Sequence, residues 1–495
     1  MAYLDWRPQP GIWANGTARM SEGFWRDGNL MRFPDATDPQ PWKGWTARGS
    51  TTLTGVPRAI LGWRQSPPSL LRWLAISTHA HLYAQSASGV VSDITPAGFV
   101  AGVADATLGG GYGNLTYGTG TYGTSRPDGS SVTPATVGTL DVWGEKPIFV
   151  QDSDGKLYIW DLTPAHAATQ VANSPSGQAF CTVTAERFLF VGSGRTLQWS
   201  DQGVETTWAA SSTNQAGNIT LNTEGAFRCG RRVLGTHLFF TDVDVWRANY
   251  FGAPIVYGFE PVGIDCGAIS VGSPVAIDSR CVWMSQRGFF LFNGAQAQPL
   301  SCSVGDAVFS NLNVFQASKV VGVHNPFLGE VTWFYPSAAS TENDSYVTWS
   351  YHGPLPHWTK GTLARTCGEA SGIFANPIMC DPTGGIWNHE TGYNWGGAVP
   401  FLRSGPIELG AGDQRTLVSG IIPDEKTQGD ASVTLYAREF PNATETAYGP
   451  YPCTSGPPID VLFSARQVEL QVSITQPHDA RIGSFRLDVQ PDGER

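Results

Sequence analysis

The stretch Pro147-Ile-Phe-Val-Gln-Asp-Ser-Asp-Gly-Lys-Leu-Tyr-Ile-Trp160 contains the pattern that decides the fold. An apolar run leads into an Asp-Gly pair, and a second apolar run that ends in an aromatic residue follows. Asp-Gly is a strong signal for the tight turn of a β-hairpin, because both residues tolerate a positive φ there. The stretch therefore predicts two antiparallel strands joined at Asp154-Gly155.

The same hairpin pattern recurs along the chain at a regular spacing. Its first strands lie near Leu74, Phe149, Leu189, Leu238, Val282, Val331 and Ile378. The intervals are about 75, 40, 49, 44, 49 and 47 residues, and the first contains a Tyr/Gly-rich insertion at 108–136. A period of about 40–50 residues is typical of propeller blades, which bury their faces against neighbouring blades. We therefore predict a β-propeller-like domain over residues 55–395 with six or seven blades.

The composition indicates an all-β chain. Among 495 residues there are 58 Gly, 34 Pro and 18 Trp, and charged residues make up 15% where about 25% is usual. Gly and Pro favour turns and interrupt helices, so a helical bundle is excluded. Residues 305–318 alone have helical spacing, and they predict one short helix that Asp306 can cap.

The two ends of the chain differ from its centre. Residues 1–54 contain seven bulky aromatic residues among Pro and Gly, which predicts an extended, aromatic-rich segment packed against the body or against a neighbouring subunit. Residues 396–495 alternate polar and apolar side chains, as in 431–438. Such alternation is typical of half-exposed antiparallel strands, so it predicts a C-terminal β-sandwich module.

Charge and cysteine content limit the possible partners. The formal net charge is −11 and no cluster of Lys and Arg occurs, which argues against a tight grip on nucleic acid. No run of about 18 apolar residues is present, so we expect no membrane-spanning helix. The first residues lack the apolar core of a secretory signal. Eight cysteines without paired spacing predict reduced, structural thiols.

Sequence motifs for catalysis are missing. The chain has no GxSxG, no HExxH, no Walker loop and no dinucleotide-binding fingerprint in a strand–helix context. His79 and His81 are expected to share a strand face, but a third metal ligand is not evident. Asp152 and Asp154 resemble an aspartate-box turn with the wrong spacing. We therefore predict a protein that is not an enzyme and uses no cofactor and no metal.

The insertion 108–136 repeats Tyr-Gly every five residues, at Tyr112, Tyr117 and Tyr122. A Gly-rich stretch of this kind is usually a mobile surface loop. The alternative is a loop that orders against a neighbouring subunit, because tyrosine gives a large contact area at a low entropic cost. The three tyrosines are therefore candidate inter-subunit contacts.

Many short stretches together resemble the tail nozzle proteins of bacteriophages, a family that includes the packaged-DNA stabilisation proteins of short-tailed phages. The N-terminal stretches are 11–17, 23–33 and 44–45. The central ones are 199–201, 213–217, 241–245, 257–260, 316–319, 324–325, 330–336 and 361–365, and the C-terminal ones are 404–410 and 486–489. The resemblance covers most of the chain and brings no catalytic residue with it.

This resemblance implies a structural virion protein of the phage tail that is assembled in the host cytoplasm. Such nozzles form a ring, commonly a hexamer, below the portal and adaptor, where they close and later conduct the genome-ejection channel. The implied partners are further copies of the chain, a head-to-tail adaptor protein and tail spike or fibre proteins. Genomic DNA would pass without sequence-specific binding, and stable membrane insertion is not expected. An acidic channel wall would suit that passage, because carboxylates repel phosphates.

Two other classes of function stay open at this point. A receptor-binding tail module would form trimers with an aromatic cleft for glycans. A propeller glycosidase or lyase acting on host surface glycan would need two carboxyl groups that face each other across a cleft. No local motif supports the second class.

Overall fold

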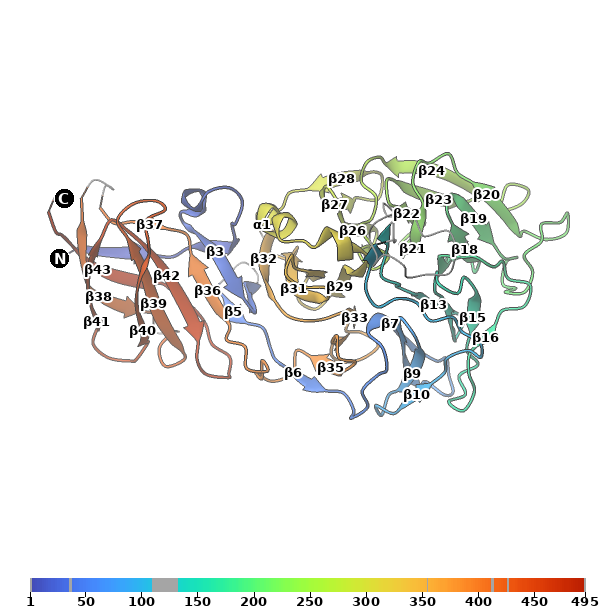
Figure 1. The fold of residues 1–495 in the computed structure, drawn as a ribbon, viewed down its shortest axis with the longest axis horizontal. Helices are drawn as coiled ribbons and strands as arrows, with labels where there is room; N and C mark the ends of the chain where they lie inside the picture. Colours follow the sequence, from blue (N-terminus) through green and yellow to red (C-terminus); the bar gives the residue numbers. More distant parts are fainter. Residues whose placement is uncertain are drawn as a thin grey trace, which may run out of the picture.

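The computed structural model describes residues 2–34, 38–108, 132–353, 355–410, 414–424 and 427–493. These residues form an elongated all-β molecule with a β-sandwich at one end and a β-propeller at the other (Figure 1). The predicted fold class is therefore confirmed. Both chain ends lie in the sandwich.

Within the described residues the propeller consists of seven four-stranded antiparallel sheets. Blade 1 is β7 (Pro57–Arg64), β8 (Arg72–Thr78), β9 (Leu82–Ser86) and β10 (Val91–Asp93), and blade 2 is β13 (Thr139–Trp143), β14 (Lys146–Val150), β15 (Leu157–Ile159) and β16 (Thr169–Gln170). Blade 3 is β17 (Phe180–Val183), β18 (Leu189–Ser193), β19 (Thr196–Trp199) and β20 (Gly217–Thr220), and blade 4 is β21 (Phe227–Val233), β22 (Thr236–Thr241), β23 (Val245–Tyr250) and β24 (Tyr257–Gly263). Blade 5 is β25 (Val275–Ile277), β26 (Arg280–Ser285), β27 (Gly288–Phe292) and β28 (Ala297–Leu300), and blade 6 is β29 (Val321–Asn325), β30 (Glu330–Pro336), β31 (Asn343–Ser350) and β32 (His357–Thr362). Blade 7 is β33 (Cys367–Glu369), β34 (Ile378–Cys380), β35 (Ile386–His389) and β6 (Trp45–Ala47).

The predicted repeat matches these blades. Each of the seven predicted positions falls in the second strand of a blade, namely β8, β14, β18, β22, β26, β30 and β34. The predicted turn at Asp154-Gly155 joins β14 to β15, and Gly155 has φ +67°. A Cβ on Gly155 would lie 2.8 Å from the Cα of Gly177 in the next connection, so both the turn and the close approach require glycine.

Blade 7 is completed by a strand from the other end of the propeller sequence. Strand β6 pairs with β35 in antiparallel register, with Trp45 opposite His389 and Ala47 opposite Trp387. The innermost strand of blade 7, β33, lies beside β7 of blade 1, so the circle of blades is closed. The expected extended N-terminal segment is thus a set of strands, because its backbone groups find partners far away in the sequence.

The sandwich is built from both ends of the chain. One sheet has the order β1-β43-β38-β41, where β1 is Ala2–Trp6, β43 is Phe485–Pro491, β38 is Thr416–Pro423 and β41 is Ile459–Ala465. The other has the order β2-β3-β36-β42-β39-β40, with β37 (Ile407–Glu408) also on β42. These strands are β2 (Gln9–Ile12), β3 (Phe24–Asn29), β36 (Phe401–Ser404), β42 (Gln467–Ile474), β39 (Ala431–Arg438) and β40 (Thr446–Pro452). Val433, Leu435 and Phe485 are buried between the sheets, as the alternation in β39 predicts.

Short elements complete the chain. Strands β4 (Met31–Arg32) and β5 (Gln40–Pro41) pair with each other, as do β11 (Thr107–Leu108) and β12 (Val132–Thr133). The helix predicted over 305–318 is shorter: α1 covers Gly305–Ser310, and a 3-10 turn covers Val314–Lys319. Asn313 interrupts it, because its backbone and side chain donate to Pro336 and Ser340 of blade 6. The Asp306 carboxylate does not cap the helix; it accepts a hydrogen bond from the Gly16 N–H.

Burial agrees with two further expectations. Trp6, Trp25, Phe33 and Trp42 of the N-terminal region are buried in the largest core cluster. All eight cysteines are free, and all but the half-buried Cys302 are buried. Among the described residues, no helix has the length and hydropathy that crossing a bilayer requires.

Candidate functional site: the propeller axis and the junction with the sandwich

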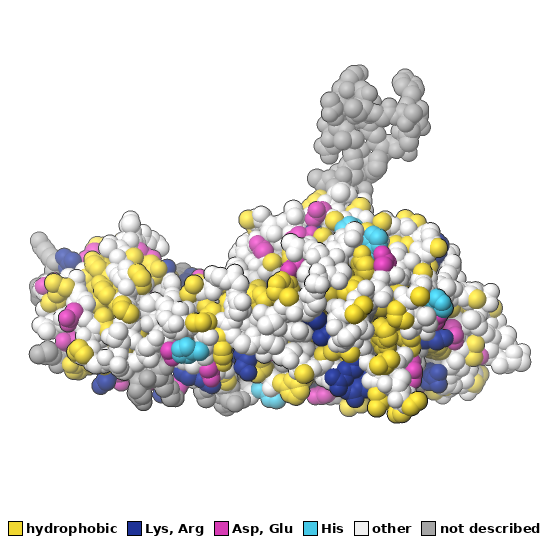
Figure 2. All heavy atoms as spheres, turned by 90° about the horizontal axis from the view of Figure 1, so that it is seen from below, with side chains coloured by type: hydrophobic (Ala, Val, Ile, Leu, Met, Phe, Trp, Pro, Cys, Tyr) yellow, Lys and Arg dark blue, Asp and Glu magenta, His cyan; other side chains and the backbone are white. Residues whose placement is uncertain are grey.

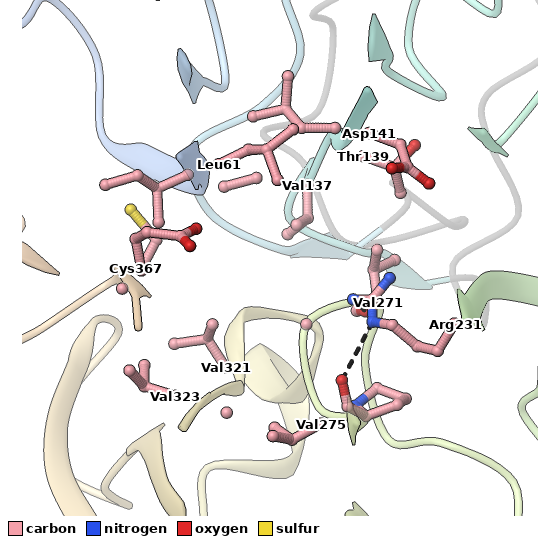
Figure 3. A pocket seen from close by; sticks show the side chains of 18 of the residues that line it. Leu61, Val137, Thr139, Asp141, Arg231, Val271, Val275, Val321, Val323 and Cys367 are labelled. Carbon is pink, nitrogen blue, oxygen red and sulfur yellow. Dashed lines mark hydrogen bonds between the residues drawn. The ribbon is translucent and has the colours of Figure 1, made fainter. Parts of the chain in front are cut away.

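The propeller axis holds a cavity of about 360 Å³ lined by the first strands of all seven blades. Apolar side chains converge on it, among them Leu61, Val137, Val271, Val321 and Val323 (Figure 3). They come from the middle of strands that lie closest to the axis, where alternate residues must point inward. The centre of the axis is therefore apolar, and polar groups occupy its margins.

Arg231 is the most deeply engaged cation at the axis. Its Nε donates to the Pro274 carbonyl at 3.1 Å, as Figure 3 shows, and its Nη2 donates to the Val271 carbonyl at 2.8 Å. Its Nη1 donates to the carbonyl of Gly230 at 3.0 Å. Since backbone carbonyls occupy every nitrogen of the guanidinium, Arg231 ties blade 4 to the start of blade 5 and is not presented to a ligand.

Asp141 has a similar structural role between blades 2 and 3. Its carboxylate accepts hydrogen bonds from the Val142 N–H at 2.8 Å, the Val183 N–H at 2.7 Å and the Thr182 hydroxyl at 3.1 Å. Burial raises the pKa of Asp141, although these hydrogen bonds and Arg232 oppose the rise. The carboxylate is thus held by the fold and is not free to act on a substrate.

Glu369, at the end of β33, differs from both. Burial raises the pKa of its carboxyl to about 7, and the Gly62 N–H donates the one hydrogen bond that opposes the rise. Its neighbours at the axis are poor nucleophiles and bases, because burial raises the pKa of the Cys181 thiol to about 12 and lowers that of His237 to about 3. The cavity can exchange a proton near neutral pH, but we find no paired nucleophile and base in the described part of the chain. Nor do those residues contain a group of three metal ligands.

The junction between propeller and sandwich contains a buried ionic cluster. The Arg32 guanidinium lies 3.2 Å from a Glu330 oxygen and makes a two-pronged contact with Glu390 at 2.7 and 2.8 Å. Burial lowers the pKa of Arg32, but the two carboxylates more than offset it, and the net shift is upward. Burial likewise raises the pKa of Glu330 to about 7 against the opposing charge of Arg32. The cluster joins β4, blade 6 and the residue after blade 7.

Further hydrogen bonds cross the same junction. The Tyr346 hydroxyl accepts from the Leu30 N–H at 2.7 Å, and the Asn29 side chain accepts from the Thr362 N–H at 2.9 Å. Lys360 forms an ion pair with Asp27. Because buried groups on both sides are satisfied across the boundary, the two bodies are held in one fixed relation.

A groove of about 370 Å³ opens at this junction, and we call it the junction groove. Its apolar walls include Pro41, Phe327, Leu328, Pro377 and Tyr393. Its polar lining comes from both bodies, namely Arg32, Gln40, Lys43, Asn325, Ser371, Asn376, Glu390, Asp479 and Arg481. Figure 2 shows the elongated molecule from the side, with charged side chains of both signs where the two bodies meet.

The residues singled out in the sequence have mixed outcomes. Tyr112, Tyr117 and Tyr122 lie outside the described residues. His79 and His81 lie in the turn after β8 and not on a strand, and their ring nitrogens contact Val56 and Asp93 respectively. Asp154 accepts a hydrogen bond from Tyr158 in its own hairpin. The Arg32 cluster and Glu369 went unnoticed in the sequence, because no local motif joins partners that lie hundreds of residues apart.

Comparisons with known proteins add a likeness of fold. A streptogramin B lyase structure has a TM-score of 0.40 and 8% identity, covering 70% of this chain and 97% of that one. The WD40 domain of Pan2 from Neurospora crassa has a TM-score of 0.39 and 8% identity, covering 72% and 96%. Both are β-propeller proteins, as the seven four-stranded sheets are here. No protein-family profile and no curated protein sequence matches this chain.

Proposed function

We propose that this chain is a structural subunit of a bacteriophage tail nozzle, in which copies form a ring around the channel for genome ejection. The observation that carries the proposal is where the resembling stretches lie. Residues 23–33 supply β3 and Arg32, residues 330–336 supply Glu330, and 361–365 include Thr362, which bonds to Asn29. The residues that resemble nozzle proteins thus build the joint between the two bodies.

A fixed joint suits a mechanical role. A ring that withstands the pressure of a packed genome needs subunits that do not bend between their own domains. Here the N-terminal residues pair within the sandwich, contact blades 5 and 6 and then complete blade 7. Rigid two-body subunits of this kind support the proposal better than a hinged enzyme with a closing cleft.

The charge balance also supports passage of DNA without retention. Each copy carries a formal charge of −11, and basic side chains in the described residues are mostly paired, as in Arg58 with Glu342 and Lys319 with Glu342. Duplex affinity depends largely on unpaired Lys and Arg that neutralise phosphates. We propose that the wall facing the channel is acidic, so that DNA slides past it.

Electron microscopy of the purified full-length protein, with native mass spectrometry, tests the proposal. We expect closed rings with an open centre and a mass that is a whole multiple of 53.2 kDa. A protein that stays monomeric at every concentration, or that forms trimers without a channel, would contradict it. Trimers with glycan affinity would instead favour a receptor-binding module.

A further inference from the structure

The outer turn of blade 4 presents two large apolar side chains to solvent. This turn, residues 251–256 between β23 and β24, has Phe251 at 68% exposure and Ile255 at 66%. The turn contains no charged residue. Neighbouring exposed apolar side chains of this size mark an interaction surface. We call residues 251–256 the blade-4 knob.

The knob rests on a rigid base. Tyr250 packs against Phe188 and Tyr257, with ring centroids 5.5 and 5.4 Å apart, and its hydroxyl donates to the Gln215 side chain at 3.2 Å. The Phe251 ring lies on β24, where a Cβ at Gly258 would come within 2.6 Å of it. A knob held in place before binding loses little conformational entropy on docking.

The junction groove has features that complement this knob. Phe327, on the turn between β29 and β30, forms one lip of the groove and is 76% exposed. Pro41, Pro377 and Tyr393 continue the apolar wall, and the groove volume is of the size that large apolar side chains fill. Aromatic and aliphatic anchors inserted in such pockets dominate the energy of interfaces.

Polar groups of the groove also fit an uncharged turn. The Arg32 charge in its floor is neutralised by Glu330 and Glu390, so an apolar occupant would not strand an unpaired cation. Gln40 and Asn325 place side-chain amides along the lining. An amide can donate to or accept from the backbone of a turn, which needs such partners once water is removed.

We infer that the blade-4 knob of one copy seats in the junction groove of the next copy. This inference rests on the proposed ring, and it names the contact that builds it. The knob and the groove lie on opposite sides of the propeller, with blade 4 away from the sandwich (Figure 1), so one chain cannot fill its own groove. Two different surfaces that meet in this head-to-tail way generate rings when the rotation closes.

Charged substitutions in the full-length protein test the contact. Phe251→Asp in the knob and Phe327→Asp in the groove should each weaken self-association at least tenfold, as measured by analytical ultracentrifugation. Val314→Asp is the matched control, because Val314 is 68% exposed and lies in neither surface. All three residues are exposed, so folding should persist and circular dichroism can verify it. Unchanged assembly of both variants would overturn the inference.

Mixing the two variants tests the head-to-tail geometry. The Phe327→Asp protein keeps an intact knob and the Phe251→Asp protein keeps an intact groove, so the mixture should form dimers that cannot grow further. A contact between two identical surfaces would give no such rescue, and that result would overturn the inference. A disulfide ladder from the double variant Ile255→Cys, Phe327→Cys would support it, since the eight native cysteines are all at least half-buried.

Failure of the contact and failure of the nozzle proposal give different results. Closed rings that persist in both variants would reject this contact and leave the nozzle intact. Open filaments in the unmodified protein, abolished by both variants, would support the contact and reject the closed ring. An unmodified protein that stays monomeric would reject both.

Discussion

The propeller and the sandwich are both antiparallel β structures, but the chain builds them in opposite ways. In blades 1 to 6 each sheet is a run of consecutive strands, so nearly all pairing is local. In the sandwich β1 pairs with β43 and β3 pairs with β36, so each sheet joins the two ends of the chain. The propeller is therefore encoded segment by segment, whereas the sandwich exists only when distant segments meet.

Removing residues 1–47 should have the largest effect on this comparison. The deletion takes away β1, β2 and β3 from the sandwich and β6 from blade 7. It exposes the cores of both bodies, so we expect the cooperative thermal unfolding of the full chain to be lost, as followed by circular dichroism. If the truncated protein unfolds at the same temperature as the full chain, the N-terminal strands are dispensable and the comparison is wrong.

The substitution Arg32→Met separates the joint from the two bodies. It leaves Glu330 and Glu390 buried without their cation, which should cost about 3–5 kcal/mol of unfolding free energy in urea. The control is Arg7→Met, because Arg7 is an exposed partner of Asp38 and should cost less than about 1 kcal/mol. Equal effects of the two substitutions would show that the buried cluster does not hold the joint.

Glu369→Gln examines the propeller axis alone. The pKa of Glu369 is about 7 in the folded chain, above its ordinary value of 4.5. Between these values the unfolded chain releases the proton and the folded chain keeps it, so stability is fully present below pH 4.5 and falls as pH rises through 7. The loss should be at most about 3 kcal/mol, and the variant should lack it. Parallel stability profiles of the two proteins from pH 4 to 8 would contradict this.

The smallest expected difference is in thiol labelling of the unmodified protein. Cys453 reports on the sandwich, and Cys181, Cys229 and Cys281 report on the propeller; all four are buried. Terminal strands open more easily than enclosed ones, so Cys453 should react several-fold faster than the other three. Mass spectrometry after timed alkylation gives the rates. Faster labelling of the propeller cysteines would reverse the comparison.

Sequence patterns predicted what is local in this molecule. The hairpin near Phe149 and its six equivalents have alternating apolar residues and turn signals within about fifteen residues, so all seven blades could be located. The alternation in 431–438 likewise revealed β39. The partner of each end strand carries no signal in the other, because pairing through backbone hydrogen bonds is compatible with many sequences. For that reason β6 in blade 7 and β1 on β43 were not foreseen.

The candidate site was harder to predict than the fold for a related reason. Arg32 and Glu390 are 358 positions apart, and each looks like an ordinary surface charge in its own segment. Glu369 is unusual only because the neighbouring strands bury it. The helix at 305–318 was overestimated, since its spacing is helical but bonds from Asn313 to blade 6 end it early.

The closure of blade 7 by β6 has a consequence for biosynthesis. During translation β6 leaves the ribosome long before β35, so its hydrogen-bonding edge waits unpaired while six blades are made. Closing so long a loop late in folding is slow, and exposed edges invite wrong partners meanwhile. An unfinished chain also lacks the completed joint between β4 and the residues after blade 7. The fold thus acts as a checkpoint: nascent chains cannot present a finished junction groove, and only complete subunits become competent for assembly.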